Sequence, residues 1–245
     1  MFTETNKGFT IITNFGCDNR CPYCISKHHP LLQNEVTNIK DINWNYLEEC
    51  IKNSKSPKVN LSGGGDPLYK YNEHLDFYNK VYDICKRNNK LMDVHTRVFI
   101  KDNDTLLSKF NKIAMTIEFN NELAFKELKE NFNNLSSLTN LRVIQVVNKD
   151  FTVEKCKEYI NKLKHIGIKQ ITFREMFGNK NANKWFNTLK KHIEEKDGIY
   201  FLKDGEYHDY YFTNNNKLYP YFFGNFKDDR DKMRKRYEEV EQECM

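Results

Sequence analysis

The chain has 245 residues, which allows one large domain or two small ones, since domains usually contain roughly 100–200 residues and α/β barrels reach about 250. Hydrophobic residues make up 39% and charged residues 30%, with only 10 Gly and 5 Pro, which excludes collagen-like, low-complexity and wholly disordered chains. The net charge of +5 permits an anionic ligand but is too small to indicate a nucleic-acid-binding surface.

No apolar run approaches the ~18 residues of a membrane span, and residues 1–10 lack the apolar stretch of a signal peptide. We therefore expect a cytoplasmic protein, whose seven cysteines should not form a disulfide framework. In that setting clustered cysteines indicate metal binding or redox chemistry. Three lie close together, Cys17, Cys21 and Cys24. The others are scattered and are interpreted as small buried hydrophobic residues: Cys50, Cys85, Cys156 and Cys244.

Short runs rich in β-branched and aromatic residues alternate with segments of helical periodicity, which indicates βαβ units and a parallel sheet. The predicted strands are residues 9–15, 58–61, 91–94, 113–119, 141–147 and 169–173. The clearest helix is Val153–Ile166, with Thr152 as its N-cap and Gly167 after its last turn. This pattern predicts a partial (β/α)6 TIM-like barrel, because a closed eight-stranded barrel would need the whole chain.

The pattern changes after Phe177. A short amphipathic helix, two strands, a turn and a returning strand are expected, since Asn tolerates the positive φ of a turn. These elements are residues 185–195, 198–202, 208–213, 214–216 and 217–223, and a solvated charged helix follows from Lys227. We therefore expect a partial barrel over residues 1–178. Residues 179–245 should form a small hairpin and helix extension that caps the barrel and is not an independent domain.

The first predicted strand runs into the sequence Phe15-Gly16-Cys17-Asp18-Asn19-Arg20-Cys21-Pro22-Tyr23-Cys24. Three thiolates with these spacings on one loop can bind one face of an iron–sulfur cube. No fourth cysteine lies nearby, so one iron would stay open to a substrate or cofactor. Structural zinc is the alternative metal and usually takes four ligands, so His28 or His29 would complete that site. Otherwise these two histidines are interpreted as solvent-exposed.

With Tyr23 before its third cysteine, this loop resembles the defining loop of the radical S-adenosylmethionine superfamily. The resemblance implies that Cys17, Cys21 and Cys24 hold a [4Fe–4S] cluster whose open iron binds S-adenosyl-L-methionine. It also implies an external electron donor, such as flavodoxin or ferredoxin, and cleavage of the cofactor to a 5′-deoxyadenosyl radical. In such an enzyme the cofactor carries the radical chemistry, and the protein orients the reactants and excludes water.

A glycine-rich segment, Ser62-Gly63-Gly64-Gly65-Asp66-Pro67, follows the second predicted strand. Consecutive glycines let the backbone approach a charged amino-acid group closely. The segment is similar to the Gly-Gly-Glu-Pro motif of the same superfamily, which implies that Gly63, Gly64 and Gly65 bind the methionyl part of the cofactor. Asp66 would place a carboxylate near its ammonium group, although a third glycine displaces the acid from the superfamily position.

Polar residues at the carboxyl ends of later strands complete the expected cofactor site, since barrels bind ligands at that end. Thr96 stands where relatives often carry Thr-Asn-Gly or Ser-Asn-Gly. Arg174 resembles the arginine on the sixth strand of molybdopterin-precursor-type relatives and would pair with the cofactor carboxylate. Glu118 and Asn148 end the fourth and fifth strands. We rank Thr96, Asn148 and Arg174 above Glu118 as ligands.

The segment 209–221 resembles the hairpin that opens the cluster-binding extension, of the SPASM or twitch type, in peptide-modifying radical enzymes. A cysteine follows the Tyr-Pro pair there, whereas Tyr221 follows Tyr219-Pro220 here, so no auxiliary cluster is expected. The hairpin would instead cap the barrel and shape the substrate pocket. Its many aromatic side chains would stack on a base, pack against a peptide or form a small core of their own.

Together, the resemblances imply a radical enzyme that abstracts hydrogen from a peptide or small metabolite. An enzyme that modifies nucleotides or RNA is an alternative, viperin-like or deazaguanine-type, with Arg174, Lys180 and Lys184 holding phosphates. A glycyl-radical activase is another, and its expected partner would be a second enzyme. An iron–sulfur or zinc module without catalytic activity is the hypothesis from a different class.

Overall fold

The computed structural model describes residues 8–19, 21, 23–24, 26, 36–101, 103–176, 181–203, 208–220 and 222. Its strands are β1 (Gly8–Thr13), β2 (Lys58–Gly63), β3 (Leu91–Thr96), β4 (Lys112–Thr116), β5 (Asn140–Val147), β6 (Gln170–Glu175), β7 (Ile199–Leu202), β8 (His208–Phe212) and β9 (Lys217–Tyr219). Its α-helices are α1 (Trp44–Asn53), α2 (Leu75–Arg87), α3 (Asp104–Leu107), α4 (Glu122–Leu138), α5 (Val153–Ile166) and α6 (Ala182–His192). Two 3₁₀ turns cover Ile39–Asp41 and Tyr71–His74.

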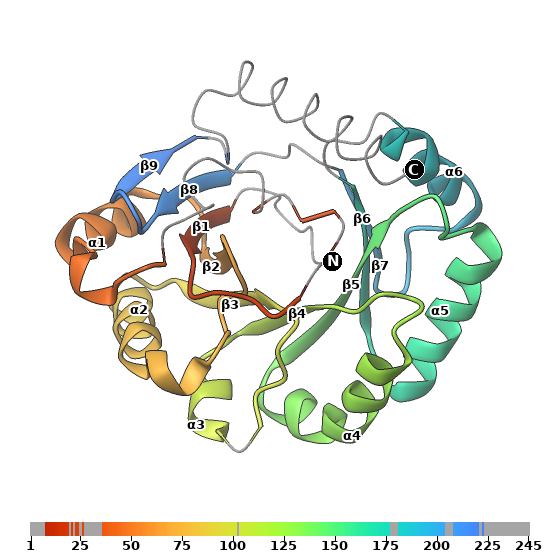
Figure 1. Cartoon of the computed structure of the whole chain (residues 1–245), viewed down its shortest axis with the longest axis horizontal. Helices are drawn as coiled ribbons and strands as arrows, with labels where there is room; N and C mark the ends of the chain where they lie inside the picture. Colours follow the sequence, from red (N-terminus) through yellow and green to blue (C-terminus); the bar gives the residue numbers. More distant parts are fainter. Residues whose placement is uncertain are drawn as a thin grey trace.

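All the strands belong to one curved sheet in the order β7-β6-β5-β4-β3-β2-β1-β8-β9. Neighbours from β7 to β8 are parallel, and only β9 runs antiparallel to its neighbour. The helices lie along the outer side of the curve (Figure 1). Within the described residues β7 and β9 are the free edges of the sheet, so it does not close. The predicted partial TIM-like barrel is confirmed.

The hairpin of β8 and β9 joins the barrel sheet directly. β8 pairs in parallel with β1, with Tyr210 opposite Thr10 and Phe212 opposite Ile12. The edge of β1 that the six predicted strands would leave unpaired is therefore hydrogen-bonded to the C-terminal part of the chain. β7 extends the sheet beyond β6 in the same way. The helix expected from Lys227 lies outside the described residues, as do Tyr221 and Phe223.

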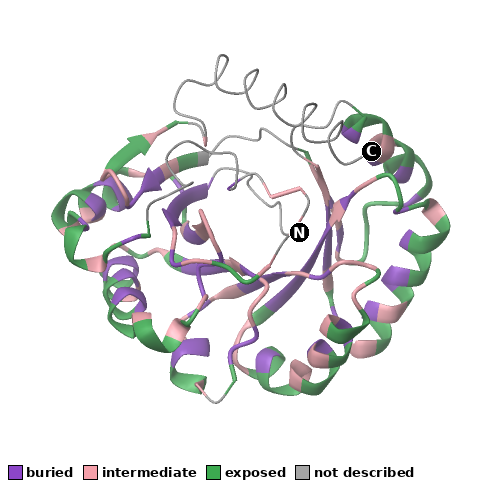
Figure 2. Ribbon diagram, viewed as in Figure 1, coloured by how far each residue is buried: buried purple, intermediate pink, exposed green. Residues whose placement is uncertain are grey.

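The apolar core lies between the sheet and the helices, and Figure 2 shows buried residues on the helix sides that face the strands. Helix α5 buries Cys156, Tyr159 and Leu163 on one face, as its periodicity predicts. The Thr152 side chain accepts a hydrogen bond from the Lys155 amide, and Gly167, with a φ of 108°, ends the helix. Two more cysteines interpreted as hydrophobic are buried, Cys50 and Cys85, and Cys244 lies outside the described residues.

The opposite face of the strands is polar, because side chains alternate between the two faces of a strand. Thr10, Asn60 and Asp93 stand in register on β1, β2 and β3, and all three are buried. Asp93 accepts a hydrogen bond from the Asn111 amide group and lies 3.7 Å from the Lys58 ammonium. This part of the inward side is therefore polar, and the buried Asp93 carboxylate there is paired.

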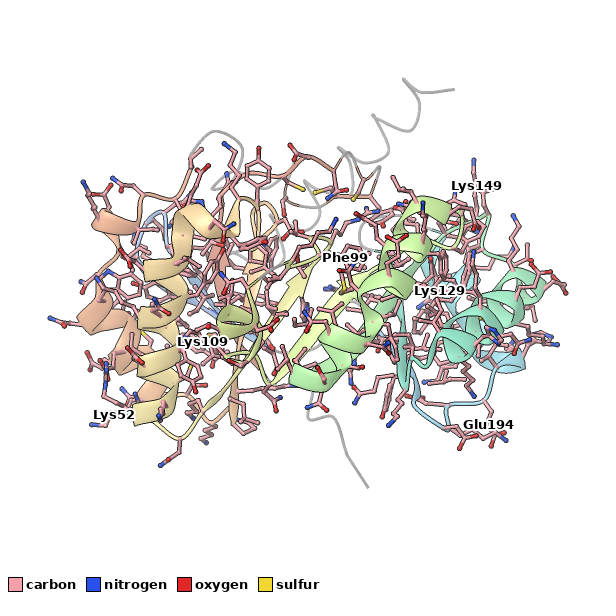
Figure 3. The ribbon with its side chains drawn as sticks, turned by 90° about the horizontal axis from the view of Figure 1, so that it is seen from below. Lys52, Phe99, Lys109, Lys129, Lys149 and Glu194 are labelled. Carbon is pink, nitrogen blue, oxygen red and sulfur yellow. The ribbon has the colours of Figure 1, made fainter. Side chains whose placement is uncertain are left out.

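The two ends of the barrel differ in what they carry. Lys149, which follows β5, marks the end at which the parallel strands finish, and Lys52 and Glu194 lie toward the opposite end (Figure 3). An open depression of about 530 Å³ lies at that opposite end, near the starts of β3 and β5, where α2, α3 and α4 finish. In the part of the chain that the structure describes, no helix combines the length and apolar character needed to cross a membrane.

Candidate active site

The cysteine loop and the glycine-rich loop follow neighbouring parallel strands, β1 and β2, and their backbones are hydrogen-bonded to each other. The Asp66 amide donates to the Gly16 carbonyl over 2.8 Å, and the Gly64 amide donates to the Thr13 carbonyl over 2.7 Å. A Cβ at residue 65 would lie 2.3 Å from the Gly16 oxygen, which is far inside van der Waals contact. Glycine at residue 65 is therefore required for the two loops to meet.

The same pair of loops is joined again on the other side of the cysteines. The Ser26 hydroxyl donates to the Gly63 carbonyl over 2.8 Å, and Ser26 is buried. Gly16 takes a φ of 106°, a left-handed conformation that turns the chain just before Cys17. The cysteine loop thus contacts the glycine-rich loop both before its first cysteine, at Gly16, and after its third cysteine, at Ser26.

The three cysteines differ in exposure: Cys17 is exposed, whereas Cys21 and Cys24 are half-buried. The Cys24 amide donates to the Cys21 carbonyl over 3.2 Å, and the Asn19 amide donates to the Cys17 sulfur over 3.3 Å. Among the described residues, no three Cys, His, Asp or Glu side chains are gathered closely enough to form a metal site. The donor set nevertheless fits an iron–sulfur cluster, because three soft thiolates share one short loop.

A network of side chains connects the cysteine loop to the ends of β3 and β4. Arg97 Nη1 lies 2.6 Å from Cys21 Sγ and 3.5 Å from Glu118 Oε1. The Tyr23 hydroxyl donates to the same Glu118 oxygen over 2.7 Å. One cation therefore lies against Cys21, and one carboxylate holds both that cation and Tyr23.

The electrostatics of this network keep its donors protonated. Burial, reinforced by Glu118, raises the pKa of Tyr23, so Tyr23 remains a hydrogen-bond donor. Burial alone would lower the pKa of Arg97, but the facing Cys21, Tyr23 and Glu118 outweigh it and the pKa is raised. Burial raises the pKa of the Cys21 thiol, and the Arg97 charge opposes that rise. Arg97 is thus a permanent positive charge beside Cys21.

Asp66 and Thr96 were expected to touch the cofactor, and the structure pairs them with each other. Asp66 Oδ1 accepts from the Thr96 hydroxyl over 2.6 Å and from the Leu68 amide over 2.9 Å. Its Oδ2 accepts from the Arg97 amide over 2.6 Å. Asp66 is only 5% exposed, and burial raises the pKa of its carboxyl group, against the effect of these hydrogen bonds. The pair holds the end of β3 against the glycine-rich loop and fixes the backbone that carries Arg97.

Asn148 and Arg174 lie on β5 and β6, outside this network. Asn148 Oδ1 accepts from the Asp150 amide and shapes the turn that leads to α5. The Arg174 backbone stands in register with Val146 and Leu202, and its side chain forms no hydrogen bond or ion pair with any described residue. Its charge is therefore available to an anion. Lys184 is exposed on α6, whereas His28, His29 and Lys180 lie outside the described residues.

Sequence reasoning did not select Arg97 or Ser26. Arg97 directly follows Thr96 at a predicted strand end, and a cation at that end of a parallel strand is the signal that would have identified it. Ser26 carries no comparable signal, because its partner is a backbone carbonyl of a loop 37 residues later in the chain.

Comparison with known proteins gives a likeness in fold. No family model matches the sequence, and no curated protein matches it. Among solved structures, methylornithine synthase (PylB) superposes with a TM-score of 0.54 over 96% of this chain and 82% of that chain, at 11% sequence identity. The chain therefore shares its overall fold with that enzyme.

Proposed function

We propose that this protein is a radical S-adenosylmethionine enzyme. The observation that carries the proposal is the hydrogen-bonded junction between the cysteine loop and the glycine-rich loop, centred on the Asp66 amide and the Gly16 carbonyl. The junction joins the loop that carries the three cysteines to the loop that carries the three glycines, at the carboxyl ends of β1 and β2. The solved structure with the shared fold, methylornithine synthase, is itself a radical S-adenosylmethionine enzyme.

Cys17, Cys21 and Cys24 would hold the [4Fe–4S] cluster, and Gly63, Gly64 and Gly65 would face the amino-acid end of S-adenosyl-L-methionine. When bound, these groups supply a 5′-deoxyadenosyl radical that abstracts one hydrogen from the substrate.

The other residues proposed for the cofactor site lie at three places around it. Tyr23 and Glu118 border the cysteine loop from the β4 side. Asp66 and Thr96 keep the glycine-rich loop and the end of β3 in place. Across the barrel mouth, Asn148 adds a polar rim. The guanidinium of Arg174, which pairs with none of the described residues, would bind the carboxylate of the cofactor.

A peptide or small metabolite is the proposed substrate. Tyr221 stands directly after the Tyr-Pro pair, where peptide-modifying relatives carry a cysteine, and Cys244 is the one cysteine further along the sequence, which favours a reaction without an internal electron relay. An external donor such as flavodoxin or ferredoxin would then reduce the single cluster.

Anaerobic reconstitution with iron and sulfide tests the proposal. The wild-type protein should bind about four irons per chain, and reduction in the presence of S-adenosyl-L-methionine should release 5′-deoxyadenosine. Cys21→Ala should abolish both, whereas Cys50→Ala, at a buried cysteine on α1, should retain both. Binding of one zinc per chain without 5′-deoxyadenosine would overturn the proposal. Adding candidate peptides, metabolites or nucleotides and measuring the rise in 5′-deoxyadenosine would identify the substrate class.

A further inference from the structure

The cysteine loop leaves the sheet and returns to it at a neck formed by Asn14 and Thr37. The Thr37 amide donates to the Asn14 carbonyl over 2.8 Å, and the Asn14 amide donates to the Thr37 hydroxyl oxygen over 2.8 Å. All three cysteines lie between these residues in the sequence. The neck therefore fixes the first and the last residue of the cysteine loop next to each other.

The turn between β8 and β9 is bonded directly to this neck. Thr37 Oγ1 donates to Asn214 Oδ1 over 2.7 Å and lies 3.0 Å from Thr213 Oγ1. The Thr213 amide and hydroxyl both bond to the Ile12 carbonyl, at 3.1 Å and 3.0 Å. Thr37 and Thr213 are 5% and 2% exposed, so water does not replace these bonds. Two residues from near the C-terminus thus close the loop that opens after β1.

Contacts on both sides of the turn fix the β8–β9 hairpin to the segments that form the neck. The packing of Phe212 against Ile12 lies directly before the turn. At the far side of the turn, Asn216 accepts from the Asn43 amide over 2.7 Å and donates to the Asp41 carbonyl over 2.9 Å. The segment that follows the neck is therefore fixed to the same turn up to the start of α1.

We propose that the β8–β9 turn is a positioning element for the cysteine loop. Thr213 and Asn214 hold the neck closed, and the closed neck limits how far the three thiols move. The proposal rests on the proposed function only for the identity of the ligand that the loop receives, because closure of the neck is a property of the protein alone. Disturbing the turn should loosen the cysteines and weaken their hold on a cluster.

Three substitutions separate this role from general stability. Thr213→Val keeps the side-chain shape and removes the hydroxyl, whereas Thr213→Ser keeps the hydroxyl and should rescue the defect. Asn215→Ala is the matched control in the same turn. Asn215 bonds to the Tyr219 hydroxyl and the Lys217 amide, both within the hairpin and not at the neck.

The first measurement uses metal-free protein and the rate of alkylation of each cysteine. Loss of a buried hydrogen bond shifts an opening equilibrium about tenfold, so Cys21 and Cys24 should react roughly 5- to 30-fold faster in Thr213→Val. The already exposed Cys17 should change least. Thr213→Ser and Asn215→Ala should react at the wild-type rate. Equal rates in wild type and Thr213→Val, or equally fast rates in Thr213→Val and Asn215→Ala, would overturn the proposal.

The second measurement uses reconstituted protein and the rate at which a chelator removes iron. Thr213→Val should lose iron several-fold faster than wild type, with Thr213→Ser restoring the wild-type rate. Should wild-type protein bind no cluster, the proposed function would fail, and the alkylation rates would still decide the role of the turn. Should the cluster form with wild-type retention in Thr213→Val, the turn would have no positioning role, and the proposed function would stand.

Discussion

Arg97 Nη1 lies 2.6 Å from the sulfur of Cys21, which joins the end of β3 to the centre of the cysteine loop. Asp66 fixes the Arg97 backbone, and Glu118 lies 3.5 Å from the same guanidinium nitrogen. The arginine is therefore held from both ends and is not free to swing toward solvent. A fixed cation that donates to a sulfur is one of the means by which a protein sets the potential of an iron–sulfur cluster.

Replacing Arg97 by Gln should lower the reduction potential of the bound cluster. Reduction adds negative charge, and loss of the neighbouring cation makes that charge less stable. A change of about 60 mV corresponds to a tenfold shift of a one-electron equilibrium, and a shift on that order is expected. The measurement is a redox titration followed by electron paramagnetic resonance. Arg97→Lys keeps the charge and should shift the potential less; an unchanged potential in Arg97→Gln would contradict the role assigned to Arg97.

Gly65→Ala should separate the two loops of the site. Its Cβ would lie 2.3 Å from the Gly16 oxygen, a backbone atom that cannot turn away as a side-chain tip can. We expect iron binding to fall several-fold and the melting temperature to drop by a few degrees. Gly167→Ala is the control, because it strains the positive φ at the end of α5, far along the barrel. It should lower the melting temperature and leave iron binding intact. Equal iron contents in the two variants would show that the loop junction does not support the cluster.

Local sequence signals predicted the alternating strands and helices of the partial barrel. Thr152 and Gly167 marked the two ends of α5 in the sequence, because each stabilises a helix terminus through hydrogen bonds with residues close by in the chain. The strands could be located because apolar runs in parallel sheets are nearly continuous. The predicted fourth strand was too long at its end: Ile117 still donates to the Ile144 carbonyl, but the Asn121 amide bonds to the Glu118 carbonyl and turns the chain toward α4.

The parts that sequence reasoning missed depend on partners far away in the chain. Nothing near Arg97 indicates that it meets Cys21, which lies 76 positions earlier. Likewise, β8 has the pattern of any hairpin strand, and only the structure shows that it pairs with β1. Asp66 has the residue type of a ligand, yet its burial and three donors make it a support for the loop. Residue type thus led to the proposed chemistry, whereas the tertiary contacts show which of the selected side chains are bonded within the protein itself.

Asp66→Asn should destabilise the protein, because the carboxylate accepts from two amides and one hydroxyl and an amide side chain would turn a donor toward one of them. An unpaired buried polar group costs about 1–3 kcal/mol, which is roughly 2–10 °C in melting temperature for a chain of this size. Thermal unfolding followed by circular dichroism measures it. Glu127→Gln is a control, since the interaction that its side chain forms within the described residues is an exposed ion pair with Lys101. A loss no larger than that of Glu127→Gln would mean that Asp66 does not support the fold.

The cysteines themselves should fall into two classes of reactivity in the metal-free protein. Burial raises the pKa of Cys85 and of Cys156 to about 12, so at about pH 8 only on the order of one in 10⁴ of these groups is the reactive thiolate. Cys17 is exposed and should be alkylated first. Brief treatment with iodoacetamide under anaerobic native conditions, followed by peptide mass spectrometry, should label Cys17 extensively and Cys85 and Cys156 only after unfolding. Labelling of Cys156 as fast as Cys17 would contradict the assignment of α5 to the core, because that thiol lies on the buried face of the helix.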